Sequence, residues 1–102
     1  MNDLEELNKY KVNESVSVWD FVNGQRNLKV SQNSEDKISV LEFSAQVGSH
    51  VYFDEYIIKK TNIDFVNNSL ALSDFEKIQY DPFNKDQEED YKIKLNILMS
   101  KN

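Results

Sequence analysis

Short runs of β-forming residues, each followed by a turn signal, are the feature of this chain that most limits its fold. Residues 16–22 are rich in valine and aromatic side chains and lead into Asn23-Gly24. Asn-Gly suits the positive φ angles of a tight hairpin turn, and Leu28–Val30 supplies a returning strand. Residues 33–36 are polar and are typical of a loop. This pattern predicts an antiparallel hairpin.

A second, longer hairpin is predicted around Gly48-Ser49. Residues 38–47 place alternate apolar side chains on one face, and residues 51–58 carry apolar side chains on both faces. A strand with two apolar faces is either central in a sandwich or carries an exposed interaction surface. Residues 63–66 and 70–72, separated by Asn67-Asn68, predict a third and shorter hairpin.

Two short helices are predicted outside these hairpins. Ser73 and Glu76 have the spacing of a capping box, which predicts a helix over residues 74–80 that packs through Phe75 and Ile78. Asp81-Pro82 would end it, because the residue before proline avoids the helical region. At the other end of the chain, Asn2 and Glu5 predict a short helix that reaches about Tyr10.

The last element is predicted to be a strand. From Tyr91 to Met99, apolar residues occupy every second position, and only Leu98 breaks the alternation. The fold class that follows is mainly β, with about seven short antiparallel strands in a small sandwich or barrel and the two short helices. With 102 residues, the chain is expected to form one domain over 1–102.

The residues needed for familiar catalytic chemistry are scarce. The chain has one histidine, two glycines, one proline and no cysteine. Zinc sites, phosphate-binding glycine loops and base-activated nucleophiles cannot be assembled from them at known spacings. His50 follows the Gly48-Ser49 turn and is expected to be an exposed turn residue. The sequence therefore predicts no enzyme and no cofactor.

The acidic segment after Pro82 does not match a calcium loop. Such loops place oxygen ligands at alternate positions and a glycine at the sharp turn. Here Phe83 and Lys85 occupy the alternate positions after Asp81, and glycine is absent. No metal site is predicted. The alternatives are a solvated loop over residues 84–90 and a contact surface for a basic partner.

The chain is acidic, with 18 acidic and 12 basic residues and a formal net charge of −6. Duplex nucleic acid and anionic membranes are therefore disfavoured as partners, whereas a basic protein is not. The N-terminus is acidic and has no apolar stretch of the kind found in signal peptides, so a cytoplasmic protein is expected.

Two groups of residues are candidates for binding a protein partner, which itself could be basic or bind nucleic acid. Tyrosine is enriched at interface hot spots, and clustered carboxylates favour a basic partner. The first group mixes tyrosine with acid on one strand, and the second lies in the acidic segment. The candidates are Tyr52, Asp54, Glu55, Tyr56, Asp86, Glu88, Glu89 and Asp90. Trp19 and Phe21 share a strand face as well, and core packing is favoured there over base stacking.

One short resemblance bears on function. Residues 70–76, together with a strand like Lys92–Leu95, resemble a stretch of the phage-encoded inhibitors of uracil-DNA glycosylase, which are small acidic DNA mimics. The match covers about seven residues, most of which the capping box explains. It favours an inhibitory function and implies a helix followed by a strand.

The preferred hypothesis is a small acidic, non-enzymatic protein-binding module that acts as an inhibitor, anti-defence or immunity-type accessory factor. The richness in asparagine, lysine and isoleucine is typical of AT-rich bacterial or phage genomes. One alternative is a structural or assembly component, such as a virion adaptor. The other is an OB-like binder of single-stranded nucleic acid, for which Trp19 and Phe21 would form the stacking platform.

Overall fold

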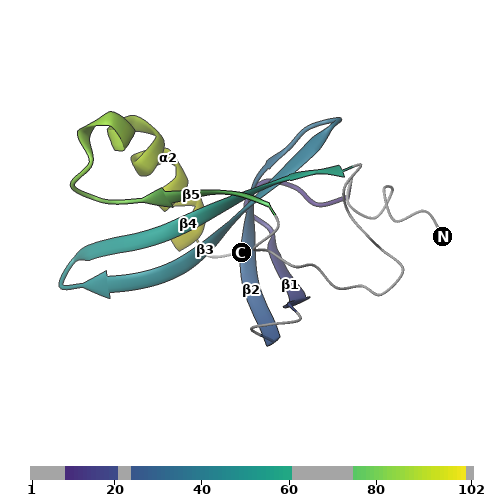
Figure 1. Cartoon of the computed structure of the whole chain (residues 1–102), viewed down its shortest axis with the longest axis horizontal. Coiled ribbons are helices and arrows are strands. Elements are labelled where there is room, and N and C mark those ends of the chain that lie inside the picture. The colour runs from purple at the N-terminus through teal and green to yellow at the C-terminus, as the bar shows by residue number, and fades with distance from the viewer. Residues whose placement is uncertain (1–8, 21–23, 61–74, 101–102) are drawn as a thin grey trace.

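The computed structural model describes residues 9–20, 24–60 and 75–100, with the side chains of residues 18–20 left out. Five antiparallel strands form one open sheet in the order β1-β2-β3-β4-β5, followed by a 3₁₀ turn and a helix (Figure 1). The elements are β1 (Ser15–Asp20), β2 (Gly24–Asn33), β3 (Lys37–Val47), β4 (His50–Lys59), β5 (Glu76–Tyr80), η3 (Lys85–Gln87) and α2 (Glu88–Met99).

The first two predicted hairpins are confirmed. β1 pairs with β2 up to Asp20 opposite Gly24, and the last two residues of the predicted strand, 21 and 22, lie outside the described residues. β3 pairs with β4 through a two-residue turn in which Gly48 has a φ of 61°. Nothing lies within 4 Å of the position that a Cβ at Gly48 would occupy, so only the backbone angle favours glycine there.

Two β-bulges interrupt the register of the sheet. One lies between Val30 and Gln32 in β2, and the other between Phe43 and Ala45 in β3. A bulge bends its strand and increases the local twist. In Figure 1, β1 and β2 accordingly cross the long β3–β4 hairpin at a steep angle. The strands remain in one open sheet, so the predicted sandwich or barrel is not borne out.

The sheet buries apolar side chains on both faces. We call the face covered by α2 the helix face and the other the opposite face. On the helix face, Tyr91, Leu95, Ile97 and Leu98 of α2 pack with Ile78 against a buried cluster. That cluster consists of Leu41, Val51, Phe53 and Tyr80. On the opposite face a second cluster contains Leu28, Val30, Ile38, Val40, Tyr56 and Ile58, with Tyr10, Val16 and Phe75 packed against it. Both faces of β4 therefore contribute to cores.

The helix predicted over residues 74–80 is wrong. Residues 76–80 form β5, which pairs with β4 from Phe53 opposite Tyr80 to Ile57 opposite Glu76. Ile78 and Tyr80 alternate onto the helix face, where Tyr80 joins the core. Pairing with the free edge of β4 outweighs the local capping preference, as tertiary contacts commonly do for weak propensities.

The strand predicted over residues 91–99 is also wrong, because this segment is α2. Tyr91, Leu95 and Leu98 are spaced by four and three residues, so they share one face of a helix. Three acidic residues occupy the first turn, where the helix dipole favours negative charge. The order of strand and helix is thus the reverse of the one that the resemblance to glycosylase inhibitors implies.

The remaining fold predictions have mixed outcomes. The described residues form five strands. Two of the seven predicted strands, the hairpin over residues 63–72, lie outside the described residues. The predicted N-terminal helix is not borne out: Lys9 and Tyr10 are not helical, and residues 1–8 lie outside the described part. Neither η3 nor α2, the helical elements of the described chain, has the length and apolar character that a membrane crossing requires.

Candidate functional site

The predicted tyrosine–acid group on β4 is divided between the two faces of the sheet. Because side chains alternate along a strand, Tyr52, Asp54 and Tyr56 belong to the opposite face and Glu55 to the helix face. Glu55 and Tyr56 are buried, with 2% and 4% of their surface exposed. The four residues therefore do not form one contact surface.

Glu55 is the centre of a buried polar cluster under α2. Its Oε1 accepts hydrogen bonds from the Lys94 ammonium at 2.8 Å and from the Tyr80 hydroxyl at 3.2 Å. Its Oε2 accepts from the Ser31 hydroxyl at 2.7 Å. Ser31 is the extra residue of the β2 bulge, which turns its hydroxyl towards the carboxylate. We call these four residues the Glu55 cluster.

The electrostatics of the Glu55 cluster favour the charged form of Lys94. Burial lowers the pKa of Lys94, but the hydrogen bonds to Glu55 and Tyr80 outweigh it, and the net shift is upward. Burial also raises the pKa of Tyr80, against the effect of its hydrogen bond with the Lys94 ammonium. The members of the cluster come from β2, β4, β5 and α2, so their interactions join the helix to three strands.

A second ion pair lies on the opposite face. The Arg26 guanidinium donates through Nε and Nη2 to both carboxylate oxygens of Glu42, and Nη2 also donates to the Tyr56 hydroxyl at 3.3 Å. The bond to Glu42 raises the already high pKa of Arg26. Burial raises the pKa of the nearby Asp54, and the negative charge of Glu42 adds to this against the attraction of Lys77. The Tyr56 hydroxyl is therefore hydrogen-bonded to a side chain of another strand in the sheet.

The acidic candidates lie where α2 begins. Asp86, Glu88, Glu89 and Asp90 are all exposed, and so is the neighbouring Asp81. With His50 and Phe83 they form what we call the acidic end. The predicted loop over residues 84–90 is in fact η3 and the first turn of α2.

An aromatic pair lies among these carboxylates. The Phe83 ring is 63% exposed and contacts His50, with 4.6 Å between the ring centroids. The Asp81 carboxylate accepts from the Phe83 backbone N–H at 2.8 Å, and Asn84 caps η3 by accepting from Asp86 N–H at 3.0 Å. These bonds fix the turn that presents the ring. His50 is exposed, as predicted.

The start of α2 is held against the start of β4. The Tyr91 hydroxyl donates to the Val51 carbonyl at 2.6 Å. Burial raises the pKa of Tyr91, and the nearby Tyr52 and Asp81 add to that shift. The structure therefore brings Tyr52 to the same end of the molecule as the acidic residues. It does not bring Asp54, Glu55 or Tyr56 there.

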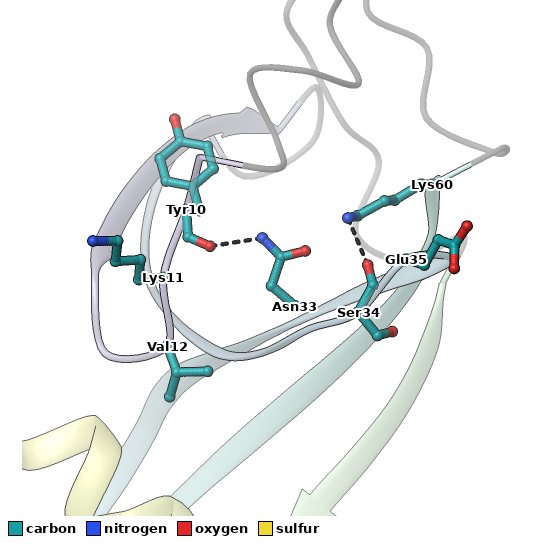
Figure 2. Close-up of a pocket in the computed structure, with 7 residues that line it drawn as sticks. All are labelled: Tyr10, Lys11, Val12, Asn33, Ser34, Glu35 and Lys60. Carbon is teal, nitrogen blue, oxygen red and sulfur yellow. Dashed lines mark hydrogen bonds between the residues drawn. The ribbon is translucent and has the colours of Figure 1, made fainter.

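A separate hollow of about 500 Å³ lies near the end of β2 (Figure 2). The Asn33 side chain donates to the Tyr10 carbonyl at 2.6 Å, and the buried Lys60 ammonium donates to the Ser34 carbonyl at 2.6 Å. Both side chains hold backbone segments together across the hollow, as Figure 2 shows. Its polar groups serve the fold, and we assign it no ligand.

Several of these residues were missed by sequence reasoning. The alternating pattern from Tyr91 to Met99 puts Lys94 on the face of a strand opposite to Leu95, and only helical geometry brings it inward with Leu95. Arg26 and Glu42 carry no local signal, because their partnership depends on the pairing of β2 with β3. Phe83 could have been found as an aromatic residue in an acidic segment after proline. The stacking platform suggested for Trp19 and Phe21 falls outside the described side chains.

Residues 9–20, 24–60 and 75–100 contain no group of three histidine, cysteine or carboxylate side chains placed to hold a metal ion. Comparisons of the chain with protein-family models, with curated proteins and with solved structures found no match.

Proposed function

We propose that this protein is a small, non-enzymatic binding module of bacterial or phage origin that docks a basic protein partner at its acidic end in the cytoplasm. It would act as an inhibitor, anti-defence or immunity-type accessory factor. The observation that carries the proposal is the Phe83 ring, which is 63% exposed among carboxylates and held in place by His50. A large exposed aromatic side chain with a charged surround has the composition of an interface hot spot.

Charge is concentrated at this end of the molecule. Residues 81–92 contain five carboxylates and two lysines, a net charge of −3 (2 − 5), which is half of the −6 of the whole chain. Such a field increases the rate of encounter with a positive surface. The fitting partner therefore presents an apolar pocket for Phe83 surrounded by lysine or arginine.

The Phe83 ring and the carboxylates should affect different rate constants of binding, and this can be tested. Buried aromatic anchors mainly slow dissociation, whereas charges at a rim mainly speed association. In this scheme Phe83 supplies most of the affinity and the carboxylates most of the encounter rate. Tyr52, which is half-buried at the same end, would extend the contact.

The first experiment identifies the partner by crosslinking from two different positions on the protein surface. A photo-crosslinking phenylalanine analogue is placed at Phe83 in one variant and at Phe43 in another, since Phe43 is also exposed, at 49%. Both variants are irradiated in lysate from a low-GC bacterium. We expect a basic protein to be crosslinked through position 83 and not through position 43. Equal crosslinking from both positions would contradict a specific site.

The second experiment measures kinetics with that partner. Phe83→Ala should accelerate dissociation and weaken binding by about 2 kcal/mol or more, while Phe43→Ala should leave both rates unchanged. Neutralising Asp86, Glu88, Glu89 and Asp90 to their amides should slow association by about tenfold at low salt. Amides are chosen over lysine because three of these residues lie in the first turn of α2, where positive charge would destabilise the helix. An association rate unchanged at every ionic strength would exclude steering by this segment.

A further inference from the structure

β1 is an edge of the sheet whose outer side has no partner strand among the described residues. The Val30 N–H donates to the Glu14 carbonyl at 2.9 Å. This bond determines which residues of β1 direct their backbone N–H and C=O groups towards β2. Hydrogen-bonded pairs then recur at every second residue, so Val16 and Val18 bond to β2. The backbone groups of Ser15, Ser17 and Trp19 therefore point away from the sheet.

This edge lacks the features that usually keep edge strands apart. Proteins protect free edges with charged side chains, proline or bulges within the strand. β5, the other edge, carries the exposed charged residues Glu76 and Lys77. β1 carries no charge, proline or bulge from Ser15 to Trp19, and its sequence Ser-Val-Ser-Val-Trp is rich in β-formers.

We propose that β1 pairs antiparallel with β1 of a second copy of this chain, about a two-fold axis at Ser17. Ser17 then lies opposite its own counterpart, and Ser15 lies opposite Trp19 of the other copy, which gives about six hydrogen bonds between the chains. A second copy fits because the five paired residues, 15–19, are neutral. Like charges meet only at the two ends of the pairing, where Glu14 lies opposite Asp20 of the other copy. The same residues meet on both sides, and the contact closes at two copies.

A groove beside the edge supports this contact. It has a volume of about 380 Å³ and includes Ser15 and Ser17 of β1, Asn27 of β2, Phe43 of β3 and Leu98 of α2. Because it extends to the edge strand, the grooves of two copies would meet across the axis. The exposed Phe43 would then line one continuous apolar trough on the helix face. This site is on a different edge of the sheet from the acidic end, so it does not depend on the proposed function.

The affinity should be modest. Pairing of one short strand buries less than the 1,200 Å² or so that stable interfaces reach, so the dimer should dissociate on dilution. Sedimentation velocity over a concentration series should show a shift from monomer to dimer. A wild-type protein that stays monomeric at about 1 mM, where a Kd of about 1 mM corresponds to a binding free energy of about −4 kcal/mol, would overturn the proposal.

A charge-swap pair tests the position of the axis. Ser17 is exposed, and its hydroxyl accepts a hydrogen bond from the exposed Gln25 amide at 2.7 Å, so Ser17→Lys and Ser17→Glu should both fold, which circular dichroism checks. Each variant alone places like charges opposite one another and should be monomeric. Their equimolar mixture should recover the dimer. Failure of either variant to dissociate, or of the mixture to recover, would overturn the Ser17 axis.

Gln79 offers a control. It is exposed and lies on β5, the other edge of the sheet. Gln79→Lys should dimerise within about threefold of wild type, because its charge lies on the edge that does not take part in the pairing. Ser17→Pro removes only an outward N–H and should abolish the dimer, as prolines at edge positions do. A dimer that survives Ser17→Pro would contradict pairing through the backbone.

Discussion

Two ion pairs of similar chemistry lie on opposite faces of the sheet, and they differ in what they connect. Lys94 and Glu55 are 2.8 Å apart under α2, with side chains 23% and 2% exposed, and two further hydroxyls bond to the carboxylate. Arg26 and Glu42 on the opposite face are 17% and 15% exposed and join neighbouring strands. The second pair reinforces a contact that the backbone ladder already makes. The first pair is a polar contact that fastens a separate helix to the sheet, in addition to the Tyr91–Val51 hydrogen bond.

The largest effect is expected from breaking the inner pair. Lys94→Ala leaves the Glu55 carboxylate buried without its counter-ion and should reduce the free energy of unfolding by about 3–5 kcal/mol. Ile93→Ala, one residue earlier, should change it by at most about 0.5 kcal/mol, since Ile93 is 60% exposed. Urea unfolding of both variants checks this. A larger loss for Ile93→Ala than for Lys94→Ala would indicate that residues 91–99 form the strand that the alternating sequence predicts.

These two neighbouring residues also show how far the sequence predicts the fold. The hairpins around Gly24 and Gly48 were predictable because turn residues and strand alternation agree there. In Tyr91–Met99 the apolar residues fit both a two-residue and a helical period, so the pattern alone does not distinguish a strand from a helix. The acidic residues of the first turn favour a helix, but in the sequence they are equally typical of a loop. An alternating strand puts Lys94 on a solvated face, so the sequence does not predict its partnership with Glu55.

The site was predictable only in part for a related reason. The half-buried Tyr52 and the exposed carboxylates Asp86, Glu88, Glu89 and Asp90 lie at one end of the molecule. Glu55 and Tyr56 are buried because β4 is central in the sheet and packs on both faces. A sequence pattern with two apolar faces cannot distinguish polar residues at an interface from polar residues paired inside a core.

The outer pair should matter less. Glu42→Gln removes the charge from a two-pronged hydrogen bond to Arg26, and we expect a loss of about 1.5–3 kcal/mol, the usual range for hydrogen bonds to charged groups. The double variant with Arg26→Gln should cost less than the sum of the two single changes, because the residues interact directly. A urea-unfolding cycle of the four proteins measures this. Additive losses would mean that the pair contributes nothing beyond its separate side chains.

The Glu55 cluster should also differ from the Arg26–Glu42 pair in making the free energy of unfolding depend on pH, through Tyr80. The pKa of Tyr80 is raised in the folded protein, chiefly by burial. The unfolded chain therefore ionises first, and the stabilisation from Tyr80 is present below about pH 10 and is lost as the pH rises towards the folded value. Tyr80→Phe should cost about 0.5–1.5 kcal/mol at neutral pH and less above about pH 10. Unfolding curves at the two pH values test this, and a cost that grows with pH would contradict it.

The smallest effect is expected at the exposed pair on the outside of the same helix. Glu88 and Lys92 are 3.5 Å apart, with side chains 61% and 71% exposed. Glu88→Gln should change the free energy of unfolding by about 0.5 kcal/mol or less, and the difference should vanish in high salt. A loss comparable to that of Lys94→Ala would show that burial does not determine the importance of these ion pairs.

Residue-resolved amide hydrogen exchange tests most directly whether the Glu55 cluster fastens α2 to the sheet. Exchange is compared among the wild type, Glu55→Gln and Glu42→Gln under native conditions, where local opening is visible. The account predicts that Glu55→Gln lowers protection of residues 91–98 by at least about tenfold, a change of about 1.4 kcal/mol, while β2 and β3 stay protected. Glu42→Gln should leave the helix unchanged. Equal loss of helix protection in both variants, or none in Glu55→Gln, would contradict the account.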